Sequence, residues 1–111
     1  MAGRQDRQER RALTQVMFRA ANEAILGPAR GRDPLTFICE CGDEMCFDVI
    51  ELTLEEYESV RADGRCFAIA SGHEGDGDSV LTEVERFTLV EKVGAGMRIA
   101  TDRDPRALMR D

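Results

Sequence analysis

Three cysteines within eight residues are the groups of this sequence best suited to chemistry. They follow the spacing C-x-C-x4-C at Cys39, Cys41 and Cys46. Thiolates are favoured ligands of zinc, which takes four sulfur or nitrogen ligands in tetrahedral structural sites. Gly42 relaxes the backbone after the first pair, and the turn-forming residues 42–44 let the chain double back toward the third thiol. The spacing therefore predicts three ligands of a metal site and leaves a fourth to be found.

Two residues compete for the fourth ligand position. His73 is the only histidine and lies in a polar loop bounded by Gly72 and Gly75, which can fold over a site at the end of a sheet. Cys66 opens an apolar run, where an isolated cysteine behaves most simply as a small buried hydrophobe. A set of four cysteines would suit an iron–sulfur cluster, but the spacings match none of the common runs. We favour zinc, held by Cys39, Cys41, Cys46 and His73, with Cys66 in place of His73 as the alternative.

A site filled by three thiolates and one imidazole has no open position for water or substrate, which is typical of structural zinc. The sequence therefore predicts a small non-catalytic zinc protein that acts as a regulatory or protein-interaction module, without a small-molecule substrate. One alternative is a redox switch in which oxidation of the thiols releases zinc. The other is a cysteine-dependent enzyme, but the single histidine cannot be both ligand and base, and no oxyanion or phosphate loop is present.

Charge is distributed unevenly along the 111 residues, whose formal net charge is −7. Residues 1–32 hold seven arginines against three acidic residues, whereas residues 33–93 hold four basic and sixteen acidic residues. The acidic body would repel nucleic acid, so we expect no nucleic-acid partner. No apolar run has the length of a membrane span or a signal peptide. We therefore expect a cytoplasmic protein, in which close-set cysteines stay reduced and bind metal.

The elements that must position these groups are two helices and several short strands. Apolar periodicity predicts a helix over residues 8–26, which Gly27-Pro28 should end. Thr53 and Glu56 form a capping-box pattern that starts a short helix reaching Arg61 or Ala62. The predicted strands are residues 35–38, 47–52, 66–70, 80–84 and 87–93. The fold class is α+β, with the N-terminal helix and the short helix packed on a small, mainly antiparallel sheet that carries a metal-binding loop.

We divide the chain into three parts. Residues 1–33 form the N-terminal helix and a linker, residues 34–93 the zinc-binding α+β core, and residues 94–111 a flexible tail with little apolar periodicity. The apolar arc of the first helix, from Leu13 to Ile25, is wider than a small sheet needs to cover. We therefore expect this helix to contact another protein or a second copy of the chain.

The short predicted helix should have one buried face and one exposed face. Tyr57 and Val60 lie on one helical face and should dock the helix on the sheet, with Arg61 extending the same side. The acidic residues of this helix should face solvent or a partner. These are Glu55, Glu56 and Glu58.

Several segments occur together in this sequence. They are Phe37-Ile38-Cys39-Glu40-Cys41-Gly42, Glu55-Glu56-Tyr57-Glu58-Ser59-Val60-Arg61 and Gly72-His73-Glu74. In this combination the sequence resembles, over residues 17–93, a family of small uncharacterised bacterial proteins. In that family C-x-C-x4-C and Gly-His-Glu recur together, whereas the position of Cys66 is usually not cysteine. The resemblance implies Cys39, Cys41, Cys46 and His73 as one set, and it implies no activity.

Overall fold

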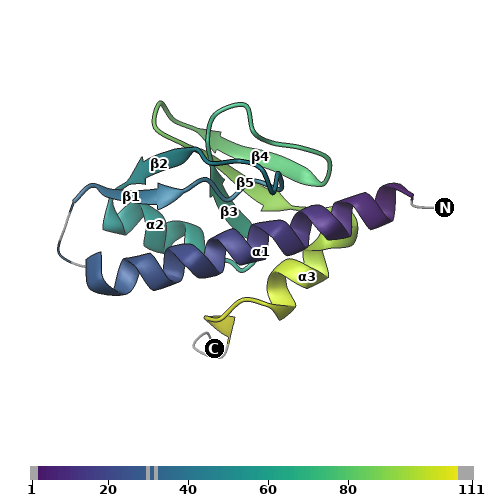
Figure 1. Cartoon of the computed structure of the whole chain (residues 1–111), viewed down its shortest axis with the longest axis horizontal. Coiled ribbons are helices and arrows are strands. Elements are labelled where there is room, and N and C mark those ends of the chain that lie inside the picture. Colours follow the sequence, from purple (N-terminus) through teal and green to yellow (C-terminus); the bar gives the residue numbers. More distant parts are fainter. Residues whose placement is uncertain (1–2, 30, 32, 108–111) are drawn as a thin grey trace.

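The computed structural model describes residues 3–29, 31 and 33–107 and has the α+β fold that the sequence predicts. In chain order the elements are α1 (Arg4–Ala29), β1 (Leu35–Ile38), β2 (Val49–Leu52), α2 (Leu54–Arg61), β3 (Cys66–Ile69), β4 (Asp78–Glu83), β5 (Thr88–Lys92), the 3-10 turn η1 (Gly94–Gly96) and α3 (Met97–Asp102). The strands form two antiparallel sheets, one of β1 and β2 and one in the order β3-β5-β4. Figure 1 shows α1 running along the molecule below both sheets.

The strands lie where they are predicted, with ends that differ by at most two residues. β2 begins at Val49 rather than at residue 47, and β4 begins at Asp78 rather than at residue 80. β4 and β5 are paired, which places the acidic loop before β4 next to the start of α1. Among the described residues, no helix combines the length and the apolar character that crossing a membrane requires.

α1 is longer than the predicted helix at both ends. It begins at Arg4, because Arg4 pairs with Asp76 at 3.0 Å and Gln8 donates to the same carboxylate at 3.1 Å. At its other end the helix includes Gly27-Pro28 and ends at Ala29. Proline removes one intrahelical hydrogen bond, and this loss is small in a last turn that no further turn must follow.

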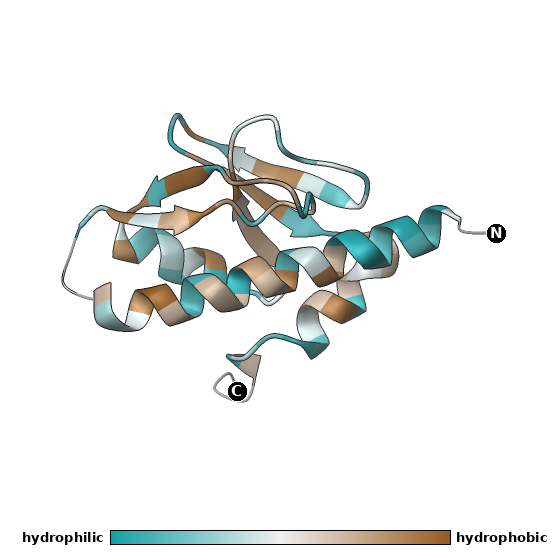
Figure 2. Ribbon diagram, viewed as in Figure 1, coloured by the Kyte–Doolittle hydropathy of each residue, from teal (hydrophilic) through white to brown (hydrophobic). Residues whose placement is uncertain are grey.

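The inward face of α1 is largely polar, and the predicted apolar arc lies only partly inside the protein. Leu13 and Met17 of that arc are 37% and 70% exposed. The buried residues of the helix are Gln8, Ala12, Gln15, Val16, Arg19, Asn22 and Leu26. Arg19 is fully buried, donates to the carbonyl oxygens of Gly64 and Ala100 at 2.7 and 2.8 Å, and covers the ring of Phe67. In Figure 2 the first turns of α1 are hydrophilic and hydrophobic residues are scattered along the rest.

The apolar core has two parts, because successive residues of β3 face opposite sides. One part includes Cys66 and Ala68 and the stacked rings of Phe37 and Tyr57, whose centroids are 4.2 Å apart. The other is built around Phe67, Ile69 and Val90 and includes Cys39 and Cys41. The first two cysteines of the motif are therefore part of a packed interior.

α2 forms as the capping box predicts. Oγ1 of Thr53 accepts from the N–H of Glu56 at 3.1 Å, and the Glu56 carboxylate accepts from the N–H of Thr53 at 2.8 Å. Tyr57 and Val60 are buried, which confirms that they dock the helix. Glu56 does not simply face solvent, because it also pairs with Arg86 at 2.6 Å.

The chain after β5 is packed, and a flexible tail is wrong for its described part, residues 94–107. η1 and α3 pack against α1, and Ala100 is fully buried. Asp104 is buried and pairs with the buried Arg61 of α2, while Arg106 pairs with Glu58. Charged contacts hold this segment in place, and apolar periodicity carries no sign of them. Residues 108–111 lie outside the described part of the chain.

Candidate metal centre

The four predicted ligand residues lie together where the loop after β1 meets the loop after β3. Their ligand atoms, three sulfurs and one ring nitrogen, all lie within 4.8 Å of one another. Nδ1 of His73 is 3.5 Å from Sγ of Cys39 and 3.6 Å from Sγ of Cys46. Bonds of about 2.3 Å to sulfur and about 2.0 Å to nitrogen at a tetrahedral zinc place a sulfur and the nitrogen about 3.5 Å apart. The cluster has the ligand types and the spacing to hold a metal ion.

A turn at Asp43 returns the chain to the cluster. The N–H of Cys46 donates to the carbonyl oxygen of Asp43 at 3.0 Å, and the N–H of Met45 donates to Oδ1 of the same residue at 2.9 Å. This side-chain bond is the reason that an aspartate suits the position. The structure confirms that residues 42–44 double back, and the third sulfur thereby meets the first two.

Two opposing influences act on the buried thiols. Burial is the larger one and raises the pKa of both Cys39 and Cys41. Backbone N–H groups oppose it, since Ala70 donates to the Cys39 sulfur at 3.1 Å and Asp43 donates to the Cys41 sulfur. Such bonds stabilise the thiolate, which is the form that binds metal. A metal ion that binds here must displace the thiol protons.

His73 is held in a defined orientation by its own loop and by Asp48, the residue before β2. Gly72 has a φ of +83°, which suits glycine, and the N–H of His73 donates to the carbonyl oxygen of Ala70 at 3.1 Å. On the far side of the ring, Nε2 is 3.2 Å from the carboxylate of Asp48. A proton on Nε2 that is donated to this carboxylate leaves the lone pair of Nδ1 directed at the sulfurs. Sequence analysis does not single out Asp48, whose only signal is an acidic residue two positions after a ligand.

Arg11 of α1 lies against both ligand-bearing loops. A Cβ added to Gly42 would be 2.8 Å from Cζ of Arg11, and one added to Gly75 would be 2.3 Å from its Nη2. Glycines at both positions therefore leave room for the guanidinium, which is 3.5 Å from Oδ2 of Asp78. Three thiolates around a divalent ion would carry a net charge of minus one, so a cation beside the loops would stabilise a filled site.

Glu40, between the first two ligand residues, fixes the loop from inside the protein. Its fully buried carboxylate accepts from Asn22 of α1 at 2.8 Å, from the hydroxyl of Tyr57 at 3.2 Å and from the N–H of Ala68 at 3.0 Å. Gln15 donates to its carbonyl oxygen at 3.2 Å. Burial raises the pKa of Glu40, and the bond from Asn22 acts against this rise. Two helices and β3 thus hold the backbone that carries the first two sulfurs.

Cys66 lies outside the cluster, on β3 opposite Glu91 of β5. It packs in the apolar core, where burial raises the pKa of its thiol to about 11, with nearby Asp63 and Glu91 adding to the rise. The thiol is therefore protonated at neutral pH and poorly suited to be a nucleophile. Within the described ranges, His73 rather than Cys66 joins the three clustered cysteines.

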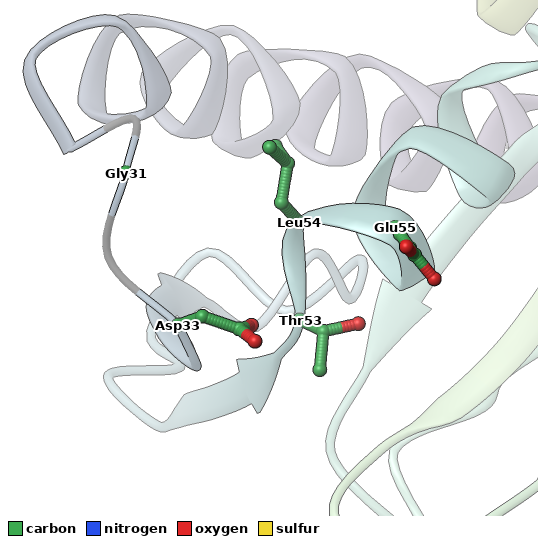
Figure 3. A pocket seen from close by; sticks show the side chains of 5 residues that line it. All are labelled: Gly31, Asp33, Thr53, Leu54 and Glu55. Carbon is green, nitrogen blue, oxygen red and sulfur yellow. The ribbon is translucent and has the colours of Figure 1, made fainter.

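A separate hollow of about 340 Å³ lies between the end of α1 and the start of α2 (Figure 3). It is lined by Gly31, Asp33, Thr53, Leu54 and Glu55. Its charged groups are two carboxylates, and the hydroxyl of Thr53 is already used as the cap of α2. This combination supplies neither a nucleophile nor a base paired with one. The Cys and His cluster is therefore the better candidate for a functional site.

No model of a known protein family, no curated protein and no solved structure matches the chain. Function is therefore argued from the chemistry of the site.

Proposed function

We propose that this protein is a small non-catalytic zinc protein. One zinc ion is held by Cys39, Cys41, Cys46 and His73. The observation that supports this most directly is the separation of 3.5 and 3.6 Å between the histidine nitrogen and two sulfurs, which suits one tetrahedral zinc. Four protein ligands leave no position for water or substrate, so the ion is structural. The protein then acts as a regulatory or protein-interaction module of the bacterial cytoplasm.

Zinc is favoured over other ions by the ligands themselves. Three thiolates exclude magnesium and calcium, which prefer oxygen, and an imidazole as the fourth ligand suits zinc. The ion would join the loop after β1 to the loop after β3, which no disulfide joins among the described residues. Since ligands are assembled only in the folded chain, the free energy of zinc binding adds to the free energy of folding.

Elemental analysis of protein purified without added metal tests the proposal. We expect one zinc per chain. Cys41→Ser should lose the metal and much of the stability, whereas Cys66→Ser replaces another buried cysteine and should keep full zinc. Asp48→Asn should keep the fold but bind zinc about tenfold more weakly, because the orienting carboxylate is lost. Full zinc occupancy in Cys41→Ser would refute the assignment.

A redox switch built on the same ligands is the second candidate, and the partial exposure of Cys46 favours it. Hydrogen peroxide would oxidise two cluster thiolates to a disulfide, take up two protons from solvent to become two waters, and release zinc. Stoichiometric zinc release on peroxide treatment, reversed by a thiol reductant and unchanged in Cys66→Ser, would support this candidate. Retention of zinc under the same treatment leaves a purely structural role.

A further inference from the structure

The most exposed apolar side chains of the protein gather at two places. Among the described residues, four large hydrophobic side chains are more than 60% exposed. Three of them, Met45, Phe47 and Val49, lie close together in the sequence and are 69%, 83% and 62% exposed. Met45 lies in the turn between Asp43 and Cys46, and Val49 begins β2. We call these three residues the apolar row. The fourth is Met17, 70% exposed, on the outer face of α1.

The apolar row is held by a rigid frame. Cys46, a ligand residue, lies between Met45 and Phe47, and Val49 pairs with Ile38 of β1. The carbonyl oxygen of Asp48 accepts from the N–H of Cys39 at 3.0 Å. Apolar surface that a fixed frame holds in water, rather than a loose loop, is typical of an interaction site.

The surroundings of the row are acidic. The chain has no lysine or arginine from residue 33 to residue 60, and the exposed acidic residues beside the row are Asp43, Glu44, Asp48 and Glu51. A surface that binds here must combine apolar side chains with positive charge.

The outer face of α1 has this combination. Arg10, Leu13, Met17 and Ala20 follow spacings of three and four residues, and all are exposed. We call these four residues the outer stripe. They belong to the arginine-rich part of the chain, whose charge balance is positive.

The outer stripe begins, at Arg10, beside the acidic loop. Arg10 and Thr14 of α1 line a hollow of about 360 Å³ together with Asp43 and Glu44, which directly precede the apolar row. A basic apolar half beside an acidic apolar half is self-complementary under two-fold rotation, because each half of one copy then faces the opposite half of the other.

We propose that this face is the interface of a homodimer, in which the outer stripe of each copy packs on the apolar row of the other. The inference deepens the proposed function, since zinc would hold the loop that carries the row. Two short apolar strips make a small interface, below about 1,200 Å² in total. Association is therefore expected to depend on protein concentration.

Sedimentation velocity of the zinc-loaded full chain, over a hundredfold range of concentration, tests the proposal. We expect a reversible monomer–dimer equilibrium. Phe47→Ser and Met17→Glu should each be monomeric, and both keep the fold because the side chains are exposed. Leu81→Ser is the matched control, since Leu81 is half exposed on β4 in the other sheet and should leave the dimer intact. A wild-type protein that is monomeric throughout the range would overturn the proposal and leave the row to a different, basic partner.

Mixing the two monomeric variants tests the pairing itself. Met17→Glu keeps an intact apolar row and Phe47→Ser keeps an intact outer stripe, so an equimolar mixture restores one of the two contacts and should sediment faster than either variant alone. If Met17→Glu still dimerises, or if the mixture stays monomeric, the pairing is wrong. Zinc content is measured on every sample: a zinc-loaded monomer overturns the interface alone, whereas a dimer that never contains zinc overturns the proposed function and keeps the interface.

Discussion

Asn22→Ala should destabilise the protein strongly, because the buried side-chain amide of Asn22 on α1 makes three hydrogen bonds to Ile38 and Glu40, the residues on either side of Cys39. Its Nδ2 donates to the carbonyl oxygen of Ile38 and to the carboxylate of Glu40, and its Oδ1 accepts from the N–H of Ile38, each at 2.8 Å. Asn22 is fully buried, so water cannot readily replace these bonds in the variant.

The magnitude follows from the three bonds. A neutral buried hydrogen bond contributes about 1 kcal/mol to stability, and one to a charged group about 1.5–3 kcal/mol. Two neutral bonds and one to Glu40 therefore predict a loss of about 3–5 kcal/mol. Domains of this size unfold with about 5–15 kcal/mol, so the variant should lose a large part of its stability. Zinc affinity should fall as well, since Ile38 and Glu40 flank the first ligand residue.

Urea denaturation of the metal-free protein, followed by far-ultraviolet circular dichroism, measures the effect. Gln5→Ala is the control, because it deletes an amide from the exposed side of the same helix and should change the free energy of unfolding by less than about 0.5 kcal/mol. If Asn22→Ala lowers the free energy of unfolding by less than about 1 kcal/mol, these bonds contribute little to stability and the reasoning is refuted.

Two further predictions concern charged contacts. Asp104→Ala should lower the free energy of unfolding by about 3 kcal/mol, because it removes one partner of the buried Arg61. Thermal unfolding measures the effect, and an unchanged melting temperature would mean that this pair does not hold the segment after α3. Arg86 lowers the pKa of Glu56 to about 2, below its ordinary value, so the stabilisation from this pair is complete above about pH 5 and is lost as the pH falls toward 2. The partners are partly exposed, so Arg86→Ala should lower the urea midpoint only slightly at pH 7, and the gap between variant and wild type should close at low pH.

Local rules predict the parts of this fold that local interactions determine. The capping box at Thr53, the strands and the turn after Cys41 all depend on residues close together in sequence. The four clustered side chains are predicted for a related reason, since their residue types leave few alternatives. The polar loop around His73 favours it over Cys66 as the fourth member of the cluster. In the structure His73 lies in the cluster and Cys66 packs in the apolar core.

The polar interior could not be predicted in the same way. Arg19 and Asn22 are buried because they donate to backbone carbonyls of distant segments, and no periodicity of apolar residues reports such partners. Apolar periodicity outlines an arc from Leu13 to Ile25 but does not separate its inner from its outer residues, and Leu13 and Met17 prove to be outside. The packing of the segment after β5 could not be predicted for the same reason. Asp104 and Arg106 are charged, and ion pairs with Arg61 and Glu58 hold them in place.

The position of Glu40 between two cysteines has a consequence for protein engineering. Short zinc-binding loops are attractive for grafting, because their ligands lie close together in sequence. Here a transplanted segment from Cys39 to Cys46 would bring a carboxylate that accepts from Asn22, Tyr57 and the N–H of Ala68 in its own protein. In a foreign scaffold that charge would be buried without donors or would turn the loop outward. The eight-residue loop can therefore be grafted only together with the groups that donate hydrogen bonds to Glu40.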